Sequence, residues 1–320
     1  MSTLNAESTL TFFPNEAGQP QHYRLKVIIG EKHKHEVVVD TGSTGILVPY
    51  DLLPQPIQPD QILNLPAPVY SSSQNSYDGE WVKTTVDIMG ANGVKVSTKE
   101  IAVFGVKGVV DDPSADVSNI GMMGIGFHST TYQNKMFNPL VNLNDINGRQ
   151  GYIIDFNGLT IGFDDAAIQS YSTVTIEEYT GIKGNFKLPK GSVKLGDKAS
   201  DYSPLENPTR FLVDTGINYM ILTAEDKRPD HYEETETQPY HFTAGLDVAL
   251  TLPDGTNGSD TSFTTQTGVT TENMDKIDPA YVRWGISDDT IINTGRHLTF
   301  VFSYLFDPKN SQIGFKKIIA

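Results

Sequence analysis

The sequence predicts a mostly β protein built from two related units. Short apolar runs alternate with turn residues, including 28 Gly and 18 Pro in 320 residues, a pattern typical of strands rather than of long helices. The pattern apolar-Val-Asp-Thr-Gly also occurs twice, in residues 38–43 and 212–217. Such a repeat indicates related structural units, and the length fits two domains. We place the boundary near residue 170, which gives an N-terminal lobe of residues 1–170 and a C-terminal lobe of residues 171–320.

Strand-like runs continue along the chain. Tyr23–Gly30 alternates apolar and polar residues, as a half-buried strand does. Residues 31–36 are charged and are expected to form the tip of a hairpin that returns through the apolar residues 37–39. Further predicted strands are Trp81–Ile88, Val94–Phe104, Tyr152–Phe156, Leu159–Phe163, Thr173–Ile176, Ser192–Leu195, Phe211–Val213, Phe242–Leu252 and Leu298–Phe306. Helical patterns are sparse, and Asp226–Thr237 and Met274–Trp284 are the candidates.

The composition bears on partners and location. The formal net charge is −15, which argues against nucleic acid as a partner, because phosphate binding needs clustered Lys and Arg. The chain has no cysteine, so it has neither a disulfide framework nor a thiolate metal site. No apolar stretch is long enough to span a membrane, and we expect no membrane partner. The location stays open: a cytoplasmic protein if it is made as shown, a secreted one if a leader was removed.

The two aspartates of the repeat are the candidate catalytic residues. Asp40 ends an apolar strand and Asp214 does the same 174 residues later, each followed by Thr-Gly. A buried aspartate is costly unless it has hydrogen-bond partners or a function, and glycine lets the backbone approach a carboxylate closely. Two carboxylates held together share one proton. One can then take a proton from water while the other donates to a carbonyl.

The sequence resembles the pepsin-like aspartic peptidases over nearly its whole length. The matching segments are the loop 40–44 with Val48-Pro49, the second loop 214–216, the apolar-Gly elements 121–126 and 292–295, and the closing segment Tyr304–Phe315. The resemblance implies an all-β, bilobal pepsin-like fold with pseudo-twofold related lobes and an interlobe cleft. It also implies that Asp40 and Asp214 lie on the cleft floor, one from each lobe. The supporting loop residues would be Thr41, Gly42, Ser43, Thr215 and Gly216.

This chemistry needs neither a cofactor nor a metal, and we expect neither. The expected partner is a peptide or a small molecule in the cleft of a monomeric protein.

Three features depart from the family pattern, two single residues and the flap. Ile217 follows the second Asp-Thr-Gly, where pepsins carry a hydroxyl residue, and Leu47 stands where many pepsins carry a tryptophan that supports the flap tyrosine. The flap, a hairpin that covers the cleft, is short or rebuilt. We expect it within residues 69–81, with Tyr77 or Tyr70 pointing inward; these tyrosines and Ile217 are the candidate substrate contacts.

The departure at Ile217 leads to an expectation about the shared proton. Ser43 can donate a hydrogen bond to Asp40, and this bond favours the ionised form. Ile217 cannot do the same for Asp214. We therefore expect Asp214 to hold the shared proton in the free protein.

The predicted function is that of an aspartic endopeptidase. Two alternatives remain open. The first is a non-peptidase enzyme that uses the two aspartates as acid and base on a small molecule. The second is a catalytically inactive binding homologue, which the intact aspartates and threonines disfavour.

Overall fold

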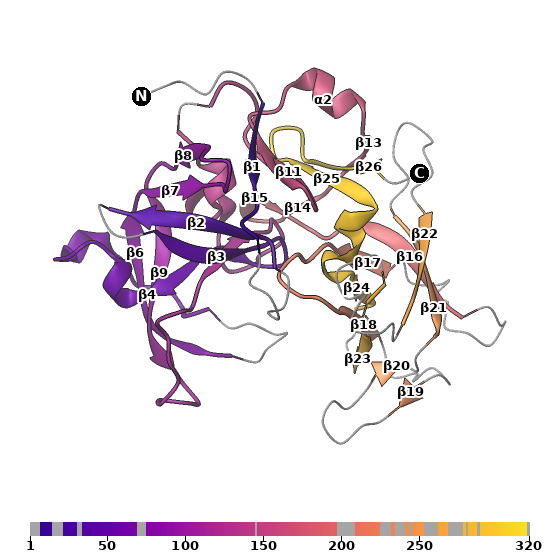
Figure 1. Ribbon diagram of the computed structural model, residues 1–320, viewed down its shortest axis with the longest axis horizontal. Helices are drawn as coiled ribbons and strands as arrows, with labels where there is room; N and C mark the ends of the chain where they lie inside the picture. Colours follow the sequence, from indigo (N-terminus) through magenta and orange to yellow (C-terminus); the bar gives the residue numbers. More distant parts are fainter. Residues whose placement is uncertain are drawn as a thin grey trace.

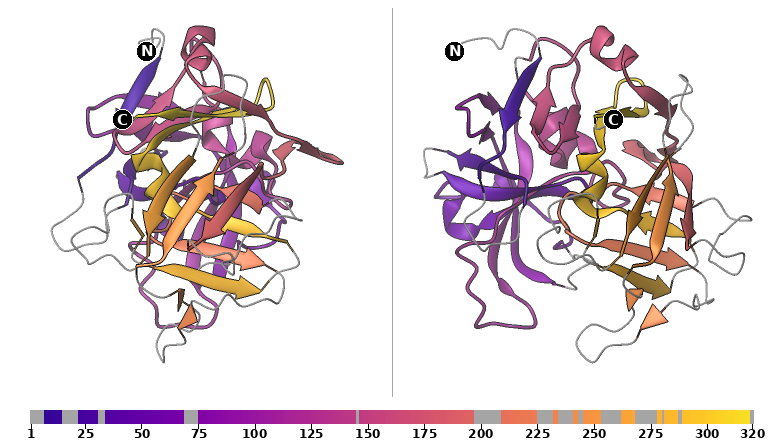
Figure 2. Two further views of the ribbon diagram at one scale, coloured as in Figure 1. Left: turned by 90° about the vertical axis from the view of Figure 1, so that its right-hand side faces the viewer. Right: turned by 45° about the vertical axis from the view of Figure 1, so that its right-hand side comes forward.

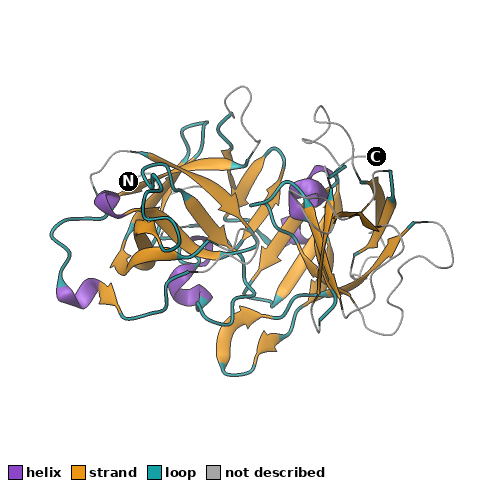
Figure 3. Cartoon of the chain, turned by 90° about the horizontal axis from the view of Figure 1, so that it is seen from below, coloured by secondary structure: helices purple, strands orange, loops and turns teal. Residues whose placement is uncertain are grey.

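The computed structural model describes most of the chain in thirteen segments. These are residues 7–14, 22–30, 34–68, 75–144, 146–196, 209–224, 232–233, 241–242, 245–252, 262–267, 278–279, 281–286 and 289–318. The protein is mostly β, and helix is confined to short pieces (Figure 3). In the described residues the helices are α1 (Asn134–Phe137), α2 (Asp165–Gln169) and the 3-10 helices η1 (Tyr50–Leu52), η2 (Pro59–Gln61), η3 (Pro139–Val141) and η5 (Gly295–Phe300).

The first large sheet comes entirely from residues before 126. Burial along Arg24–Ile29 alternates, with Leu25, Val27 and Ile29 buried, as the predicted period of two requires. In the described residues the strand order across this sheet is β5 (Ile62–Leu63), β6 (Tyr77–Thr84), β9 (Ile101–Val109), β4 (Thr44–Pro49), β10 (Met122–Ile125), β3 (His35–Asp40), β2 (Arg24–Ile29), β7 (Val86–Met89) and β8 (Lys95–Ser97).

A second large sheet repeats this arrangement in the C-terminal half (Figure 1). Its order in the described residues is β19 (Tyr232–Glu233), β20 (His241–Phe242), β23 (Val282–Ile286), β18 (Met220–Ala224), β24 (Ile291–Asn293), β17 (Thr209–Leu212), β16 (Lys190–Leu195), β21 (Asp247–Thr251) and β22 (Ser262–Gln266). The two groups of strands stand apart as two lobes in Figures 1 and 2.

The strand inserted between the two strands that flank each Asp-Thr-Gly loop shows how closely the lobes correspond. In the N-terminal lobe β10 lies between β3 and β4, and in the C-terminal lobe β24 lies between β17 and β18. Met122 pairs with Val38, two residues before Asp40, and with Leu47, seven residues after it. Asn293 pairs with the residues at the same two offsets from Asp214. Asn293 is therefore the C-terminal counterpart of Met122.

A third sheet joins the two halves of the chain. It contains β1 (Ser8–Thr11), β12 (Gly158–Ile161), β11 (Tyr152–Asp155), β25 (Phe302–Asp307), β26 (Gln312–Lys317) and β13 (Ser172–Thr175) in that order, within the described residues. It lies above and between the two lobes in Figure 1. The expected boundary near residue 170 falls between α2 and β13, so three strands of this sheet precede the boundary and three follow it. A separate hairpin, β14 (Glu178–Tyr179) and β15 (Ile182–Phe186), follows β13.

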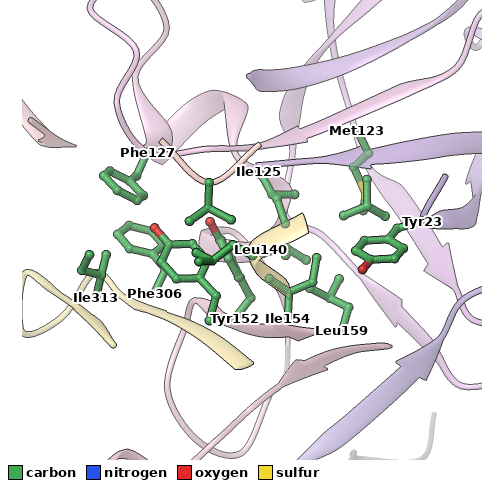
Figure 4. Packing of buried hydrophobic residues seen from close by; sticks show 14 of the residues in the cluster. Tyr23, Met123, Ile125, Phe127, Leu140, Tyr152, Ile154, Leu159, Phe306 and Ile313 are labelled. Atoms are coloured by element: carbon green, nitrogen blue, oxygen red, sulfur yellow. The ribbon is translucent and has the colours of Figure 1, made fainter. Parts of the chain in front are cut away.

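The largest apolar core runs from the N-terminal lobe through the shared sheet into the C-terminal lobe. Figure 4 shows side chains of β10, β11 and β25 packed together. Phe127 stacks on Phe306 with ring centroids 4.7 Å apart, so the first lobe is packed against a strand near the C-terminus. The labelled residues of this core are Tyr23, Met123, Ile125, Phe127, Leu140, Tyr152, Ile154, Leu159, Phe306 and Ile313.

Two local predictions need correction. Val282–Ile286 is strand β23, so the helix expected over 274–284 is wrong at its C-terminal end; the parallel pairing of β23 with β18 outweighs the local helical pattern. Leu298 belongs to the 3-10 helix η5, and the strand expected there begins at Phe302. The other helix candidate, 226–237, lies largely outside the described residues, and the part that is described is strand β19. Within the described residues no helix is long and apolar enough to cross a membrane.

Candidate active site

Hydrogen bonds between the two Asp-Thr-Gly loops hold them together. The Thr41 hydroxyl donates to the carbonyl of Val213 at 2.6 Å, and the Thr215 hydroxyl donates to the carbonyl of Val39 at 2.6 Å. Each hydroxyl also accepts from the other threonine's backbone N–H, at 3.1 and 3.2 Å. Both threonines are buried. Because buried hydrogen-bonded groups are costly to separate, this reciprocal set fixes the distance between the lobes at the site.

The glycine after each threonine lies against the opposite carboxylate. A Cβ atom at Gly42 would stand 2.6 Å from Asp214 Oδ1, and one at Gly216 would stand 2.7 Å from Asp40 Cγ. Each glycine N–H also donates to the Oδ1 atom of its own aspartate, at 2.7 Å for Gly42 and 3.0 Å for Gly216. Only glycine leaves room for the two carboxylates to meet, so the repeated Asp-Thr-Gly sequence brings together Asp40 and Asp214 as a facing pair.

The outer oxygens of the pair have different donors. The Ser43 hydroxyl donates to Asp40 Oδ2. Asn293 at the end of β24 donates from Nδ2 to Asp214 Oδ2 at 2.6 Å. Ile217 provides no hydroxyl, as expected, but the expectation that Asp214 therefore lacks a side-chain donor is wrong, because Asn293 supplies one from another strand.

The pair is buried and electrostatically coupled. Asp40 is 4% exposed and Asp214 is 7% exposed. Burial raises the pKa of Asp214 well above its usual range, and the charge of Asp40 and a hydrogen bond with Asp40 add to this effect. The hydrogen bonds from Asn293 and Gly216 act in the opposite direction on the pKa of Asp214. The result is that Asp214 favours the protonated state beside Asp40, the direction expected from the sequence, although burial and not a missing donor is the main cause.

The pair opens into a cavity between the lobes. The cavity has a volume of about 630 Å³ and contains both aspartates in its lining. Its C-terminal wall includes Ile217, Tyr219 and Ile221, and its N-terminal wall includes Leu47 and Met122. The lining thus combines apolar side chains with polar groups around the aspartate pair, an arrangement typical of binding sites. Of these wall residues, Ile217 was expected from the sequence as a substrate contact, and Leu47 was noted there only as a departure from the family pattern.

A hairpin of the N-terminal lobe contributes the remaining side of the cavity. β5 pairs with β6, so residues 64–76 connect two paired strands. Pro68, Asn75 and Tyr77 of this hairpin line the cavity. Tyr77 is half-buried and packs beside the Trp81 cluster, whereas Tyr70 lies outside the described residues.

Trp81 anchors this hairpin from within. Its ring is buried against Leu47, and its Nε1 donates to the carbonyl of Pro66 at 2.7 Å. The Tyr132 hydroxyl donates to the same carbonyl at 3.1 Å. A Cβ atom at Gly45 would approach the Trp81 ring to 3.0 Å, so a small residue there makes room for the indole. The tryptophan absent at position 47 is thus matched by Trp81 on β6, which β9 separates from β4 in the sheet, and both residues lie in one buried cluster. The contact of Trp81 with the hairpin does not follow from the sequence.

His128 is a further ionisable side chain in the cavity wall. Burial lowers the pKa of His128 to about 4, although the negative charge of Asp40 acts in the opposite direction. The ring is therefore neutral above about pH 4. His128 could not be identified from the sequence, because a lone histidine after Gly-Phe carries no motif.

The described residues contain no cluster of three or more His, Cys, Asp or Glu that could hold a metal ion. His35, from the charged tip of the first predicted hairpin, forms a hydrogen bond through Nε2 with the carbonyl oxygen of Ile120, at 2.8 Å.

Comparisons with known proteins bear on the fold. No protein-family model matches the sequence, and no curated protein matches it. Among solved structures, the chain is similar to basic 7S globulin from soybean, with a TM-score of 0.55 and 13% identity. The match covers 97% of this chain and 95% of the globulin. The protein has a bilobal, pepsin-like fold. At this identity the likeness extends to the fold alone.

Proposed function

We propose that the protein is an aspartic endopeptidase, in which Asp40 and Asp214 activate water for the hydrolysis of a peptide bond. The observation that carries the proposal is the facing pair of buried carboxylates, each packed on the other's glycine. Such a pair has few structural uses, because placing two buried carboxylates together destabilises the fold unless they share a proton.

The raised pKa of Asp214 supports a division of roles within the pair, with Asp214 as the acid and Asp40 as the base. Ionised Asp40 takes a proton from a water molecule, whose oxygen forms a bond to the substrate carbonyl carbon. Asp214 gives its proton to the carbonyl oxygen, which leaves a gem-diol. The C–N bond then breaks as the nitrogen takes the proton from Asp40. A hydroxyl proton of the gem-diol returns to Asp214 and restores the starting state.

The cavity supports an extended peptide as the substrate. Its walls come from both lobes and from the hairpin, and Leu47, Ile217 and Ile221 offer apolar contacts on either side of the pair. A hairpin above the site can exclude water from the reaction. The Trp81 and Tyr132 hydrogen bonds to Pro66 hold the base of that hairpin in place.

The test is digestion of a denatured protein between about pH 3 and 7, with and without a statine-type inhibitor, with the fragments identified by mass spectrometry. We expect internal cleavage that the inhibitor suppresses and that Asp214→Asn abolishes. Asp60→Asn, at an exposed aspartate of η2, is the matched control and should cleave normally.

Failure to cleave at any pH would contradict the proposal. The non-peptidase alternative would gain support if the inhibitor bound and no peptide were cleaved. Absence of both binding and cleavage would favour the catalytically inactive alternative.

A further inference from the structure

Asn293 lies beside the aspartate pair, at the outer oxygen of Asp214. It is the C-terminal counterpart of Met122 by strand register, yet it is polar where Met122 is apolar. It is buried, with only 8% of the residue exposed. A buried amide at an apolar position requires hydrogen-bond partners, and its partners are Asp214 and the backbone of Gly295.

The first partner fixes the orientation of the amide. Asn293 Oδ1 accepts from the backbone N–H of Gly295 at 2.9 Å. A backbone N–H can only donate, so the oxygen end of the amide must face Gly295. The nitrogen end therefore faces Asp214 Oδ2, at 2.6 Å.

The hydrogen bond from Asn293 to Asp214 differs in one respect from a hydrogen bond made by a hydroxyl. A hydroxyl, such as that of Ser43 at Asp40, can either donate to a carboxylate or accept from a carboxylic acid. An amide nitrogen can only donate. Asp214 Oδ2 must then act as an acceptor toward Asn293, whichever protonation state the pair adopts.

We propose that Asn293 takes the place of the hydroxyl that is missing at position 217, and that it confines the shared proton to the inner edge of the pair, where the two carboxylates face each other. This inference rests on the proposed function for its catalytic meaning. The proton placement itself follows from the hydrogen bonds alone. Asn293 is a positioning residue, because it acts on the substrate only through Asp214.

The inference gives a different role to Ile217 from the one expected from sequence. If Asn293 already satisfies Asp214 Oδ2, a hydroxyl at position 217 adds little. If Asn293 is replaced by an apolar residue, the same hydroxyl becomes the replacement donor. Ile217→Thr should therefore have an effect that depends on residue 293.

The experiment is an NMR titration of protein labelled with ¹³C at the aspartate carboxyl carbons, which follows the proton of the pair without requiring turnover. The variants are Asn293→Leu, Ile217→Thr and the double variant, with resonances assigned through Asp40→Asn and Asp214→Asn. Asn157→Leu, in the exposed turn after β11, is the matched control. The pair titrates as a unit, so the upper macroscopic pKa is compared.

A hydrogen bond to an ionised carboxylate lowers its pKa, so its loss must raise it. We expect the upper pKa to rise by about one unit in Asn293→Leu and to return toward the wild-type value when Ile217→Thr is added. Ile217→Thr alone should leave the upper pKa nearly unchanged, as should Asn157→Leu. If the protein cleaves peptides, the upper limb of its pH–rate profile should move with the NMR value.

An unchanged upper pKa in folded Asn293→Leu would overturn the inference. A fall of the upper pKa by about one unit in Ile217→Thr alone would also overturn the inference. This second result tests the inference even if Asn293→Leu does not fold. If the NMR shifts appear while no variant cleaves any peptide, the proposed function fails and the proton placement stands.

Discussion

At the scale of single residues, glycine determines whether the two carboxylates can meet. The inner oxygens of Asp40 and Asp214 each accept from a glycine N–H, and the same glycines leave the space that the opposite carboxylate fills. Neither role involves a side chain. The space would be lost with a single added methyl group, because atoms in a packed protein do not approach as closely as a Cβ here would require.

Gly216→Ala should therefore disable the site. The added Cβ would stand 2.7 Å from Asp40 Cγ, so the two loops must move apart. We expect affinity for a statine-type inhibitor to fall at least about 100-fold, measured by isothermal titration calorimetry. The control is Gly108→Ala in β9, where a Cβ would meet no atom within 4 Å. Wild-type affinity in Gly216→Ala would show that the carboxylates do not depend on this contact.

Some residues of the site could be predicted from the sequence and others could not. Asp40, Asp214 and the threonines could be selected because their pattern occurs twice. Asn293 could not, since its contact with Asp214 joins residues 79 positions apart and depends on strand register. The one available signal was a polar residue in an otherwise apolar element, and a single residue of this kind does not identify its partner.

At the scale of elements, the hairpin that lines the cavity with Pro68 and Tyr77 is held through the carbonyl of Pro66. This oxygen accepts from both Trp81 Nε1 and the Tyr132 hydroxyl. Trp81 also packs edge-on against Phe104 and Phe137, with centroids 5.1 and 4.9 Å apart. The hairpin base is thus held by two hydrogen bonds and one aromatic cluster. The sequence predicted a rebuilt flap in this region, but the partner of Trp81 follows from the fold.

Removal of both donors should loosen the hairpin. Trp81→Phe keeps an aromatic ring and Tyr132→Phe keeps the whole ring, so the double variant removes mainly the hydrogen bonds to Pro66. We expect faster amide hydrogen exchange in residues 62–68 and a several-fold rise in KM for a peptide substrate. Each single variant should have a smaller effect, because one donor remains.

Tyr50→Phe provides the comparison for this prediction. It removes a hydroxyl that donates to Glu80 on the same strand as Trp81, and it leaves Pro66 untouched. Exchange in residues 62–68 should stay at the wild-type rate in Tyr50→Phe. Equal rates in the double variant and the wild type would contradict the role assigned to Pro66.

At the scale of the whole molecule, the shared sheet makes the two lobes one folded unit. β25 and β26 lie at the end of the chain and yet pair with β11 and β13 from its middle. The sequence repeat predicted the two lobes, because each lobe carries its own copy of the motif. The Asp-Thr-Gly repeat did not predict this sheet, since its strands lie far from the motif and their pairing joins distant parts of the chain.

The stability of this unit should fall in acid through His22. Burial, together with the charges of Arg296 and Arg24, lowers the pKa of His22 to about 4. The unfolded chain binds a proton near pH 6.5, so folding stability is retained above that pH and is lost as the pH falls from about 6.5 to 4. The loss from one such group approaches ~1.4 kcal/mol per pH unit.

The measurement for His22 is urea denaturation at several pH values. His22→Gln should show a flatter decline of the unfolding free energy between about pH 6.5 and 4 than the wild type. The slope is compared rather than the absolute stability, because the substitution also changes local packing. Parallel curves for the two proteins would contradict the assigned role of His22.

The account depends above all on the two carboxylates acting as one unit. The most direct test compares kcat/KM for peptide cleavage in Asp40→Asn, Asp214→Asn and the double variant, with circular dichroism to verify folding. We predict that each single variant loses all measurable turnover and that the double variant is hardly worse than either, because groups that act together are not additive. Substantial activity in either folded single variant would contradict the shared-proton mechanism.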